Sequence, residues 1–175
     1  LQSVHHSASH QNEQYGVIFI DLDHFKQIND AFGHKTGDEL LVSLSKRLKA
    51  VLPEDAVLAR WGGDEFIALI PNLSDSNHLK QIAELLRGAA RESISINGME
   101  TQPTISVGFA MYPDNAESGE ELLSAADHTM YHAKHAGRNN ACFYSDIVHL
   151  KALGREHVAI QSRLSSAINH GGLQV

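Results

Sequence analysis

Between two apolar runs, the chain carries the segment Arg60-Trp61-Gly62-Gly63-Asp64-Glu65-Phe66. Two successive glycines permit a tight turn and let a ligand approach the backbone closely. The flanking apolar residues predict a β-hairpin with strands at Val57–Trp61 and Phe66–Ile70. Asp64 and Glu65 then stand at the tip of this hairpin, where their oxygens suit a hard cation. Gly-Gly-Asp also occurs in ordinary turns, so a purely structural role stays open at this point.

A second acidic site stands at the end of a buried type of strand. Four apolar residues at 17–20 lead into Asp21 and Asp23. Alternation along the strand puts these two acids on one face if the strand continues that far. Asp23 also suits the N-cap of a following helix, and this interpretation is slightly favoured for it. An unpaired charge on Asp21 is costly after an apolar run, and a cation shared with the acids of the turn would remove the cost. Mg²⁺ fits best, because it takes a few carboxylates with phosphate oxygens and water, and Mn²⁺ is the alternative.

The remaining periodicity predicts the other elements. The helices are expected at Asp23–Phe32, Gly37–Leu52, Asp75–Glu92, Glu117–Ala136 and about 146–170, with a polar helix remnant in 1–14, and the strands at Tyr15–Leu22, Val57–Trp61, Phe66–Ile70, Ser93–Asn97, Thr101–Met111 and Ala141–Tyr144. Strands and helices mix without strict alternation. This order favours an α+β fold with a central, mostly antiparallel sheet flanked by helices.

Three motifs of the chain resemble those of GGDEF domains, in the order and at the spacing of that family. The first is Phe19-Ile20-Asp21-Leu22-Asp23-His24-Phe25-Lys26-Gln27-Ile28-Asn29-Asp30, the second is Gly62-Gly63-Asp64-Glu65-Phe66, and the third is Tyr131-His132-Ala133-Lys134-His135-Ala136-Gly137-Arg138-Asn139. The resemblance covers about residues 15 to 145. It implies the palm-like, ferredoxin-related fold of nucleotide cyclases, in which the first strand and a hairpin bring acids to one metal site.

By this resemblance the chain is expected to be a diguanylate cyclase, which makes cyclic di-GMP and two pyrophosphates from two GTP. The 3′-hydroxyl of one GTP attacks the α-phosphorus of the other, and each protomer binds one nucleotide. The reaction therefore requires a homodimer, even a transient one. Asp64 or Glu65 is the candidate base for the 3′-hydroxyl proton, with a water or a substrate phosphate as the alternatives.

The resemblance also implies roles for individual residues. The expected metal ligands are Asp21, the carbonyl of Leu22 and Asp64, and the expected catalytic acids are Asp64 and Glu65. The expected substrate-binding residues are Phe25, Lys26, Lys134 and Arg138 at the phosphates, Asn29 and Asp38 at the guanine base, and Gly62 and Gly63 of the signature. The metal and the basic pair would stabilise charge on the departing pyrophosphate.

The chemistry of these residue types agrees with the implied roles. A carboxylate at Asp38 can accept hydrogen bonds from the N1–H and the amine of guanine, and the amide of Asn29 offers both a donor and an acceptor. Lys134 and Arg138 are four apart, so they are expected to share one helix face. Basic residues near a helix C-terminus also favour the helix dipole, which is the structural alternative for this pair.

The chain departs from the family at two places. Many members carry a product-inhibition site, Arg-x-x-Asp, before the signature, whereas this chain has Pro53-Glu54-Asp55-Ala56. We therefore expect weak or absent product feedback and a plain connecting turn. The Asp-x-Leu-Thr-x-Leu-x-Asn-Arg segment that usually opens the domain is missing from 1–14. The chain is accordingly expected to be a trimmed piece, whose activity is a separate question from that of its parent.

The C-terminal tail bears on domain organisation. Residues 1–148 are assigned to the GGDEF domain, with its N-terminal segment truncated, and 149–175 to a linker helix and the start of an EAL domain, the cyclic di-GMP phosphodiesterase module. A helix that packs on its own domain is the alternative for this tail. A tandem parent with an upstream sensor permits a second function, a non-catalytic GTP-binding module that controls the attached EAL domain. The intact signature favours catalysis.

Composition bounds the partners and the setting. A net charge of −7 argues against nucleic acid, whereas a mononucleotide needs only a metal ion and a few local cations. Apolar residues make up 42% and form no run long enough to span a membrane, so no direct membrane contact is expected of this segment. A single cysteine, Cys142, suits the cytoplasm, and any anchor of the parent in the inner membrane would lie upstream. His128, His132 and His135 recur at helical spacing, but no further ligands support zinc.

Overall fold

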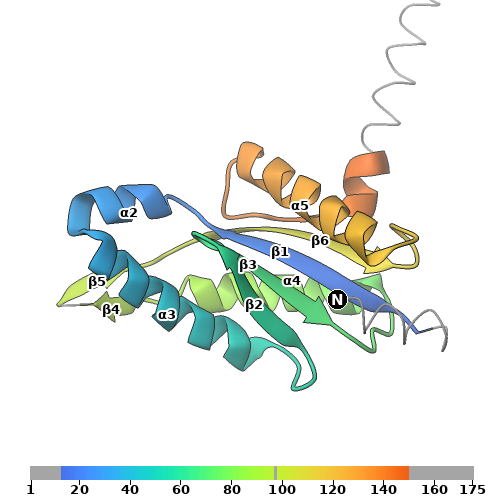
Figure 1. The fold of residues 1–175 in the computed structure, drawn as a ribbon, viewed down its shortest axis with the longest axis horizontal. Helices are drawn as coiled ribbons and strands as arrows, with labels where there is room; N and C mark the ends of the chain where they lie inside the picture. Colours follow the sequence, from blue (N-terminus) through green and yellow to red (C-terminus); the bar gives the residue numbers. More distant parts are fainter. Residues whose placement is uncertain (1–12, 97, 150–175) are drawn as a thin grey trace, which may run out of the picture. The chain divides into compact units, whose positions relative to one another are not determined.

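A computed structural model describes residues 13–96 and 98–149. It divides the chain into two compact units, Leu1–Tyr144 and Ser145–Val175, and the first unit contains the sheet with its helices (Figure 1). Among the described residues, no helix is both long and apolar enough to cross a membrane. Most of the expected N-terminal helix remnant lies outside the described residues, as does all but the first residue of the expected linker and EAL start.

The elements follow one another in the predicted order. They are β1 (Tyr15–Leu22), α2 (Phe25–Phe32), α3 (His34–Val51), β2 (Val57–Gly62), β3 (Glu65–Ile70), α4 (Ser76–Ala90), β4 (Ile94–Ile96), β5 (Met99–Thr101), β6 (Ile105–Tyr112), α5 (Gly119–His135) and β7 (Ala141–Phe143). Most boundaries agree with the prediction within a few residues. The expected strand Thr101–Met111 is instead divided, because Pro103 stands between β5 and β6 and lacks the N–H group that a strand ladder uses.

Five strands form one sheet in the order β2-β3-β1-β6-β7. Within this sheet, the pairs β2–β3, β3–β1 and β1–β6 are antiparallel, and β7 runs parallel to β6. β4 and β5 pair as a separate hairpin. The prediction of an α+β fold with a mostly antiparallel sheet is therefore confirmed. β1 is buried along its whole length and lies between β3 and β6, at the centre of the sheet (Figure 1).

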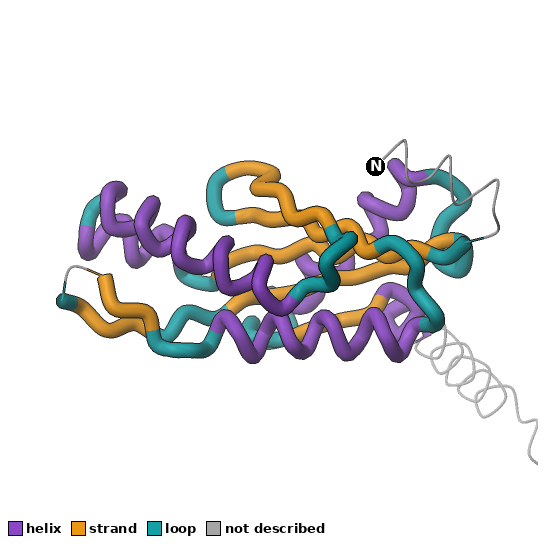
Figure 2. Tube along the Cα trace, turned by 90° about the horizontal axis from the view of Figure 1, so that it is seen from below, coloured by secondary structure: helices purple, strands orange, loops and turns teal. Residues whose placement is uncertain are grey.

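The core lies in two layers, one on each face of the sheet. α3 and α4 cover one face, and Figure 2 shows them next to each other in front of the strands. Ile18 and Ile20 of β1 belong to this layer. α5 covers the other face, where Val17 and Phe19 pack against it. Because side chains alternate along a strand, Asp21 lies on the same face of β1 as Val17 and Phe19, the face that α5 covers.

Candidate functional site

The acids of two distant motifs meet at the end of the central strand. In the ladder between β1 and β3, Asp21 stands opposite Glu65. One position further on, the N–H of Leu22 donates to the carbonyl of Asp64 at 3.2 Å. The strand register thus brings the expected metal ligands and the expected catalytic acids together, although two helices and a strand separate them along the chain.

Glycine shapes the turn that carries two of these acids. Gly62 pairs with Glu65 while Arg60 pairs with Phe66, so a bulge precedes a two-residue turn. Gly63 has φ +53°, a left-handed conformation that glycine adopts without strain. Its carbonyl accepts a hydrogen bond from Arg60 Nε at 2.9 Å. A Cβ at either glycine would meet no atom within 4 Å, so this part of the tip is open to a ligand.

Asp21 has an unusual environment for a carboxylate. It is 2% exposed, and its Oδ2 accepts a hydrogen bond from Lys134 Nζ at 2.6 Å. Its other oxygen, Oδ1, is buried without a hydrogen-bond partner. Burial raises the pKa of Asp21 to about 6; Lys134 counteracts this effect, and the charges of Asp64 and Glu65 add to it. A carboxylate in this setting is stabilised by a further cation or donor at Oδ1.

This unpartnered oxygen fits a hard cation. Mg²⁺ takes one or two carboxylates together with carbonyl, water and phosphate oxygens. Asp21 and Asp64 offer two carboxylates beside the backbone of Leu22. Among the described residues, no group of three or more His, Cys, Asp or Glu side chains could hold a metal ion by itself. The residues therefore suit a metal whose coordination is completed by backbone, substrate and water oxygens.

α5 carries Lys134 to this carboxylate because the helix packs closely on β6. A Cβ at Gly108 would lie 1.9 Å from Met130 N and 2.3 Å from Ala126 O, both backbone atoms of α5. Ala126, Met130 and Lys134 follow at intervals of four residues, so they share one side of the helix. The glycine in β6 thus sets how closely Lys134 approaches Asp21.

Arg138 does not share a helix face with Lys134, and that prediction was wrong. α5 ends at His135, and Gly137 has φ +113°. The N–H of Arg138 bonds back to the carbonyl of Ala133 at 3.2 Å, as in a Schellman-type helix end. A glycine directly behind a helical pattern is the sequence signal for such an end. One basic residue therefore lies in the last turn of the helix, and the other lies in the turn behind it.

The corner between α2 and α3 gathers the residues expected at the guanine base. Asn29 has a buried Oδ1 without a hydrogen-bond partner. This oxygen lies against Gly37, where a Cβ would be 1.9 Å away, so glycine leaves the room that the carboxamide occupies. Asp38 follows directly in the chain and is exposed. The two expected base-binding residues thus stand at one corner of the fold.

Phe25 and Lys26 open α2 shortly after the end of β1. Phe25 packs at the edge of the core, and Lys26 is exposed. Backbone N–H groups in the first turn of a helix have no acceptor within the helix, and the helix dipole favours anions there. The start of α2 therefore offers N–H groups close in the chain to the acid of β1, an arrangement that suits a phosphate beside a metal.

The interpretation of Asp23 as a helix N-cap was also wrong. His24 is the N-cap of α2, and it makes no side-chain cap bond. Asp23 is 3% exposed. Its carboxylate accepts hydrogen bonds from Thr104 Oγ1 at 2.8 Å, Ser106 Oγ at 2.7 Å and Asn139 N at 2.9 Å. Two hydroxyl residues alternating at the start of an apolar strand were the sequence signal for a buried polar partner.

The segment at 53–56 is a connecting turn, as predicted. The N–H of Ala56 donates to the carbonyl of Pro53 at 3.0 Å, and Ala56 is buried. The carboxylate of Asp55 accepts a hydrogen bond from Asn72 Nδ2 at 3.0 Å. These contacts tie the turn to the neighbouring loop.

Comparisons with known proteins agree with the motifs. Residues 1–140 match the family model described as "Diguanylate cyclase, GGDEF domain". The chain is similar to the cyclic di-GMP phosphodiesterase NbdA of Pseudomonas aeruginosa, with 36% identity over 159 residues, which make up 91% of this chain and 20% of NbdA. It is also similar to the diguanylate cyclase TpbB of the same species, with 37% identity over 134 residues, which make up 76% of this chain and 31% of TpbB.

A solved structure of a GGDEF domain is also similar to this chain. The crystal structure of the GGDEF domain of TpbB (YfiN) from Pseudomonas aeruginosa is similar with a TM-score of 0.80 and 35% identity, covering 82% of this chain and 89% of that one. The chain thus spans about a third or less of these two curated relatives, but most of the length of a single domain solved on its own.

Proposed function

The chain belongs to the GGDEF domain family, and on this premise we propose that it is a diguanylate cyclase domain. It joins two GTP into cyclic di-GMP, releases two pyrophosphates and uses Mg²⁺, with Mn²⁺ as the alternative ion. The relative named a diguanylate cyclase supports this reaction class. One observation carries the proposal: Oδ1 of Asp21 is buried without a hydrogen-bond partner, in a residue that pairs with Glu65 across the strands and whose pKa is raised by the charge of Asp64.

Asp21, Asp64 and the carbonyl of Leu22 would hold the metal. When bound there, the ion supplies positive charge to phosphate oxygens. The unpartnered oxygen of Asp21 then has the partner that its burial requires. Lys134 holds the other oxygen of the same carboxylate and so fixes its orientation toward the site.

The base binds at the corner between α2 and α3, and the first phosphates bind at the start of α2. Asn29 and Asp38 bind the guanine edge, where the unpartnered Oδ1 of Asn29 can accept from an N–H of the base. The carboxylate of Asp38 can accept from the guanine N1–H and amine together, which adenine does not offer in that arrangement. Phe25 and Lys26, at the other end of the helix, bind phosphate oxygens through backbone N–H groups and the lysine side chain.

Lys134 and Arg138 stabilise the leaving pyrophosphate. The ammonium of Lys134 has three N–H donors, so its bond to Asp21 leaves two for phosphate oxygens. Positive charge placed where negative charge develops lowers the barrier to phosphoryl transfer. Asp64 or Glu65 takes the proton of the attacking 3′-hydroxyl, unless a water or a substrate phosphate does so.

The reaction joins two nucleotides, whereas one domain carries one set of these residues. A second copy must therefore present its own GTP, so the working unit is a homodimer. Because the segment of NbdA that matches this chain makes up only 20% of NbdA, we further propose a longer parent with an upstream sensor and an attached EAL domain. The parent would work on cytoplasmic GTP, whether or not it is anchored in the inner membrane.

One comparison favours a second function. NbdA is named a cyclic di-GMP phosphodiesterase, although it contains a segment 36% identical to this chain. In that alternative the domain binds GTP and controls an attached EAL phosphodiesterase without joining nucleotides. Both functions require GTP binding, but only the cyclase turns GTP over into cyclic di-GMP.

The deciding experiment incubates the purified chain with GTP and Mg²⁺ over a wide range of protein concentrations, and follows product by chromatography. Asp64→Ala serves as the inactive control, with its fold checked by circular dichroism. Cyclic di-GMP that grows more than linearly with protein supports the cyclase. Saturable, Mg²⁺-dependent GTP binding without product supports the regulatory module. Repeating the assay on a longer, artificially dimerised chain then separates an inactive domain from one that lacks its dimer partner.

A further inference from the structure

The turn that carries Arg138 has a backbone that must be held in place. Gly137, Arg138 and Asn139 have φ of +113°, +60° and +45°. L side chains rarely adopt this left-handed conformation, and two non-glycine residues adopt it here in succession. Such a conformation persists where surrounding contacts determine it.

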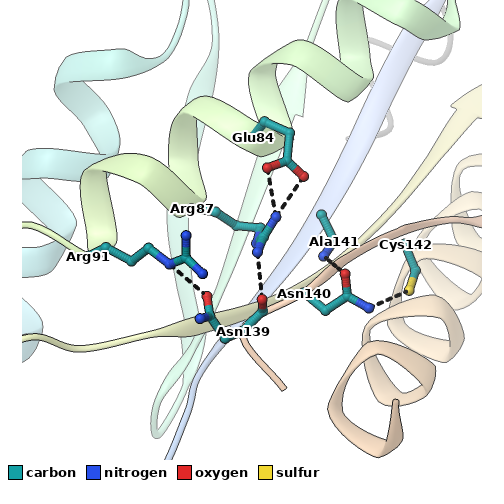
Figure 3. Close-up of polar contacts among 7 residues, drawn as sticks. All are labelled: Glu84, Arg87, Arg91, Asn139, Asn140, Ala141 and Cys142. Atoms are coloured by element: carbon teal, nitrogen blue, oxygen red, sulfur yellow. Dashed lines mark hydrogen bonds and ion pairs between the residues drawn. The ribbon is translucent and has the colours of Figure 1, made fainter. Parts of the chain in front are cut away.

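Those contacts converge on Asn139, the residue after Arg138. Its N–H donates to Asp23 Oδ2 at 2.9 Å, and its carbonyl accepts from Arg87 Nη2 at 2.5 Å. Its side-chain Oδ1 accepts from Arg91 Nε at 3.0 Å. Figure 3 shows Arg87 of α4 and Arg91, the C-cap residue of that helix, both reaching to this one residue. We call Asp23, Arg87 and Arg91 the Asn139 clamp.

Two members of the clamp, Arg87 and Asp23, are themselves held by further hydrogen bonds. Nη1 of Arg87 donates to both oxygens of Glu84, at 2.6 and 2.7 Å, which leaves Nη2 aimed at the carbonyl of Asn139 (Figure 3). Asp23 is nearly fully buried and is held by the hydroxyls of Thr104 and Ser106. The acceptor that receives the Asn139 amide therefore has little freedom to move.

The two acids at the end of β1 contact different parts of the basic segment. Asp21 holds the ammonium of Lys134 directly. Asp23 holds the backbone amide next to Arg138, and none of its three donors carries a charge. A buried carboxylate with only neutral donors is an expensive group to keep, which suggests that it serves more than local packing.

We propose that Asp23 is a positioning residue for Arg138, acting through the amide of Asn139 together with Arg87 and Arg91. The proposal rests on the phosphate-binding role of Arg138 in the proposed function. It assigns Asp23 no contact with substrate. Loss of the clamp would leave the fold and the guanine-binding corner intact, and would release the arginine from the phosphates.

The first test needs no nucleotide. Amide hydrogen exchange of Asn139 is measured in the full chain, in Asp23→Ala and in Asp23→Asn. Asp23→Ala should speed the exchange about tenfold. Asp23→Asn should restore most of the protection, because its oxygen can still accept from Asn139 and the hydroxyl of Ser106 can turn to accept from the new amide. Unchanged exchange in Asp23→Ala would overturn the proposal.

Asp75→Ala is the matched control for this test. It also removes a carboxylate that accepts a backbone N–H at 2.9 Å, that of His78 at the start of α4. Its loss costs helix-capping stability but touches no residue of the clamp. It should leave the exchange of the Asn139 amide unchanged. Faster exchange of that amide in the control as well would assign the effect to general destabilisation and contradict the proposal.

The second test is a double-mutant cycle on nucleotide affinity. Asp23→Ala should weaken GTP binding about tenfold and leave GMP binding unchanged, because the terminal phosphates are the part that Arg138 holds. In an Arg138→Ala background, Asp23→Ala should cause no further loss of GTP affinity. Losses that add, or an equal loss for GMP, would make Asp23 a structural residue only. If the unaltered chain binds no GTP, the proposed function fails and the positioning role falls with it, while the exchange data still report whether the clamp holds the turn.

Discussion

At the scale of single residues, burying the charge of Asp21 lowers the free energy of unfolding, at the position where a metal ion is proposed to bind. Burial is the main cause that raises its pKa from the ordinary 3.8 to about 6. An acid whose pKa is higher in the folded chain binds more protons there than in the unfolded chain. Its contribution to stability is therefore fully present below about pH 4 and is lost as the pH rises through about 6. The pKa shift corresponds to a decrease in the free energy of unfolding on the order of 3 kcal/mol.

This argument gives a prediction for Asp21→Asn. Without metal, the free energy of unfolding of the unaltered chain should fall between pH 4 and pH 7 by a few kcal/mol more than that of the variant. The variant should be the more stable protein at pH 7 and should have lost cyclase activity. Urea unfolding in a chelating buffer at several pH values measures the difference. Parallel stability profiles for the two proteins would contradict the pKa shift of Asp21.

A second prediction at this scale concerns the choice of base. Asp38→Ala should weaken GTP binding by roughly 1–3 kcal/mol and leave ATP binding nearly unchanged, because the lost carboxylate pairs with N–H groups that guanine offers. Equilibrium titration with both nucleotides measures this selectivity. Asp30→Ala removes another exposed carboxylate of the same region and is the matched control. An equal loss for GTP and ATP in Asp38→Ala would refute the base-binding role.

At the scale of elements, the contact of α5 with β6 decides where Lys134 lies. A Cβ at Gly108 would meet backbone atoms of α5 at 1.9 and 2.3 Å, which no side-chain rotation relieves. Gly108→Ala should therefore destabilise the chain by roughly 1–3 kcal/mol or more and lower activity by moving Lys134 from Asp21. Gly88→Ala is the matched control, because a Cβ there meets nothing within 4 Å and alanine favours the helix by about 1 kcal/mol. Urea unfolding and cyclase assays compare the two variants, and a stable, active Gly108→Ala would disprove the close packing.

Most elements could be predicted from the sequence because their signals are local. Apolar runs marked β1 and β3, helical spacing marked α3 and α4, and glycines marked the turns. The division of the strand at Pro103 was missed, although proline is itself a local signal. The faces of the sheet followed from alternation once β1 was placed at its centre.

The arrangement of the candidate site was predictable only where its residues belong to recognised motifs. Asp21 opposite Glu65 is a matter of strand register, which the two motifs anticipate. Asp23 was misassigned because a helix N-cap is the commonest role for an acid before a helix, while its real partners lie in β6 and beyond α5. Arg138 was placed on the helix by spacing alone, and Gly137 ended the helix first. Hydrogen bonds between residues far apart in the chain, such as those of Asp23, are not predicted by local sequence patterns.

At the scale of the whole molecule, the proposed reaction joins two nucleotides, whereas one chain is proposed to bind one. Two chains of net charge −7 repel each other, and two bound nucleotides add further negative charge. The dimer is therefore expected to be weak without help from a parent protein, and in the proposed mechanism Mg²⁺ and the basic pair offset the repulsion at the shared site.

This weakness gives the last prediction. The rate per chain should rise in proportion to protein concentration while monomers dominate, and should level off once dimers form. Fusion to a dimeric coiled coil should raise the rate per chain at low concentration and remove its concentration dependence, because the second site is then held at a high effective concentration. Initial rates measured over a wide dilution series, beside sedimentation of the same samples, test this. A rate per chain that stays constant in samples shown to be monomeric would mean that one domain completes the reaction alone, and would overturn the two-fold mechanism.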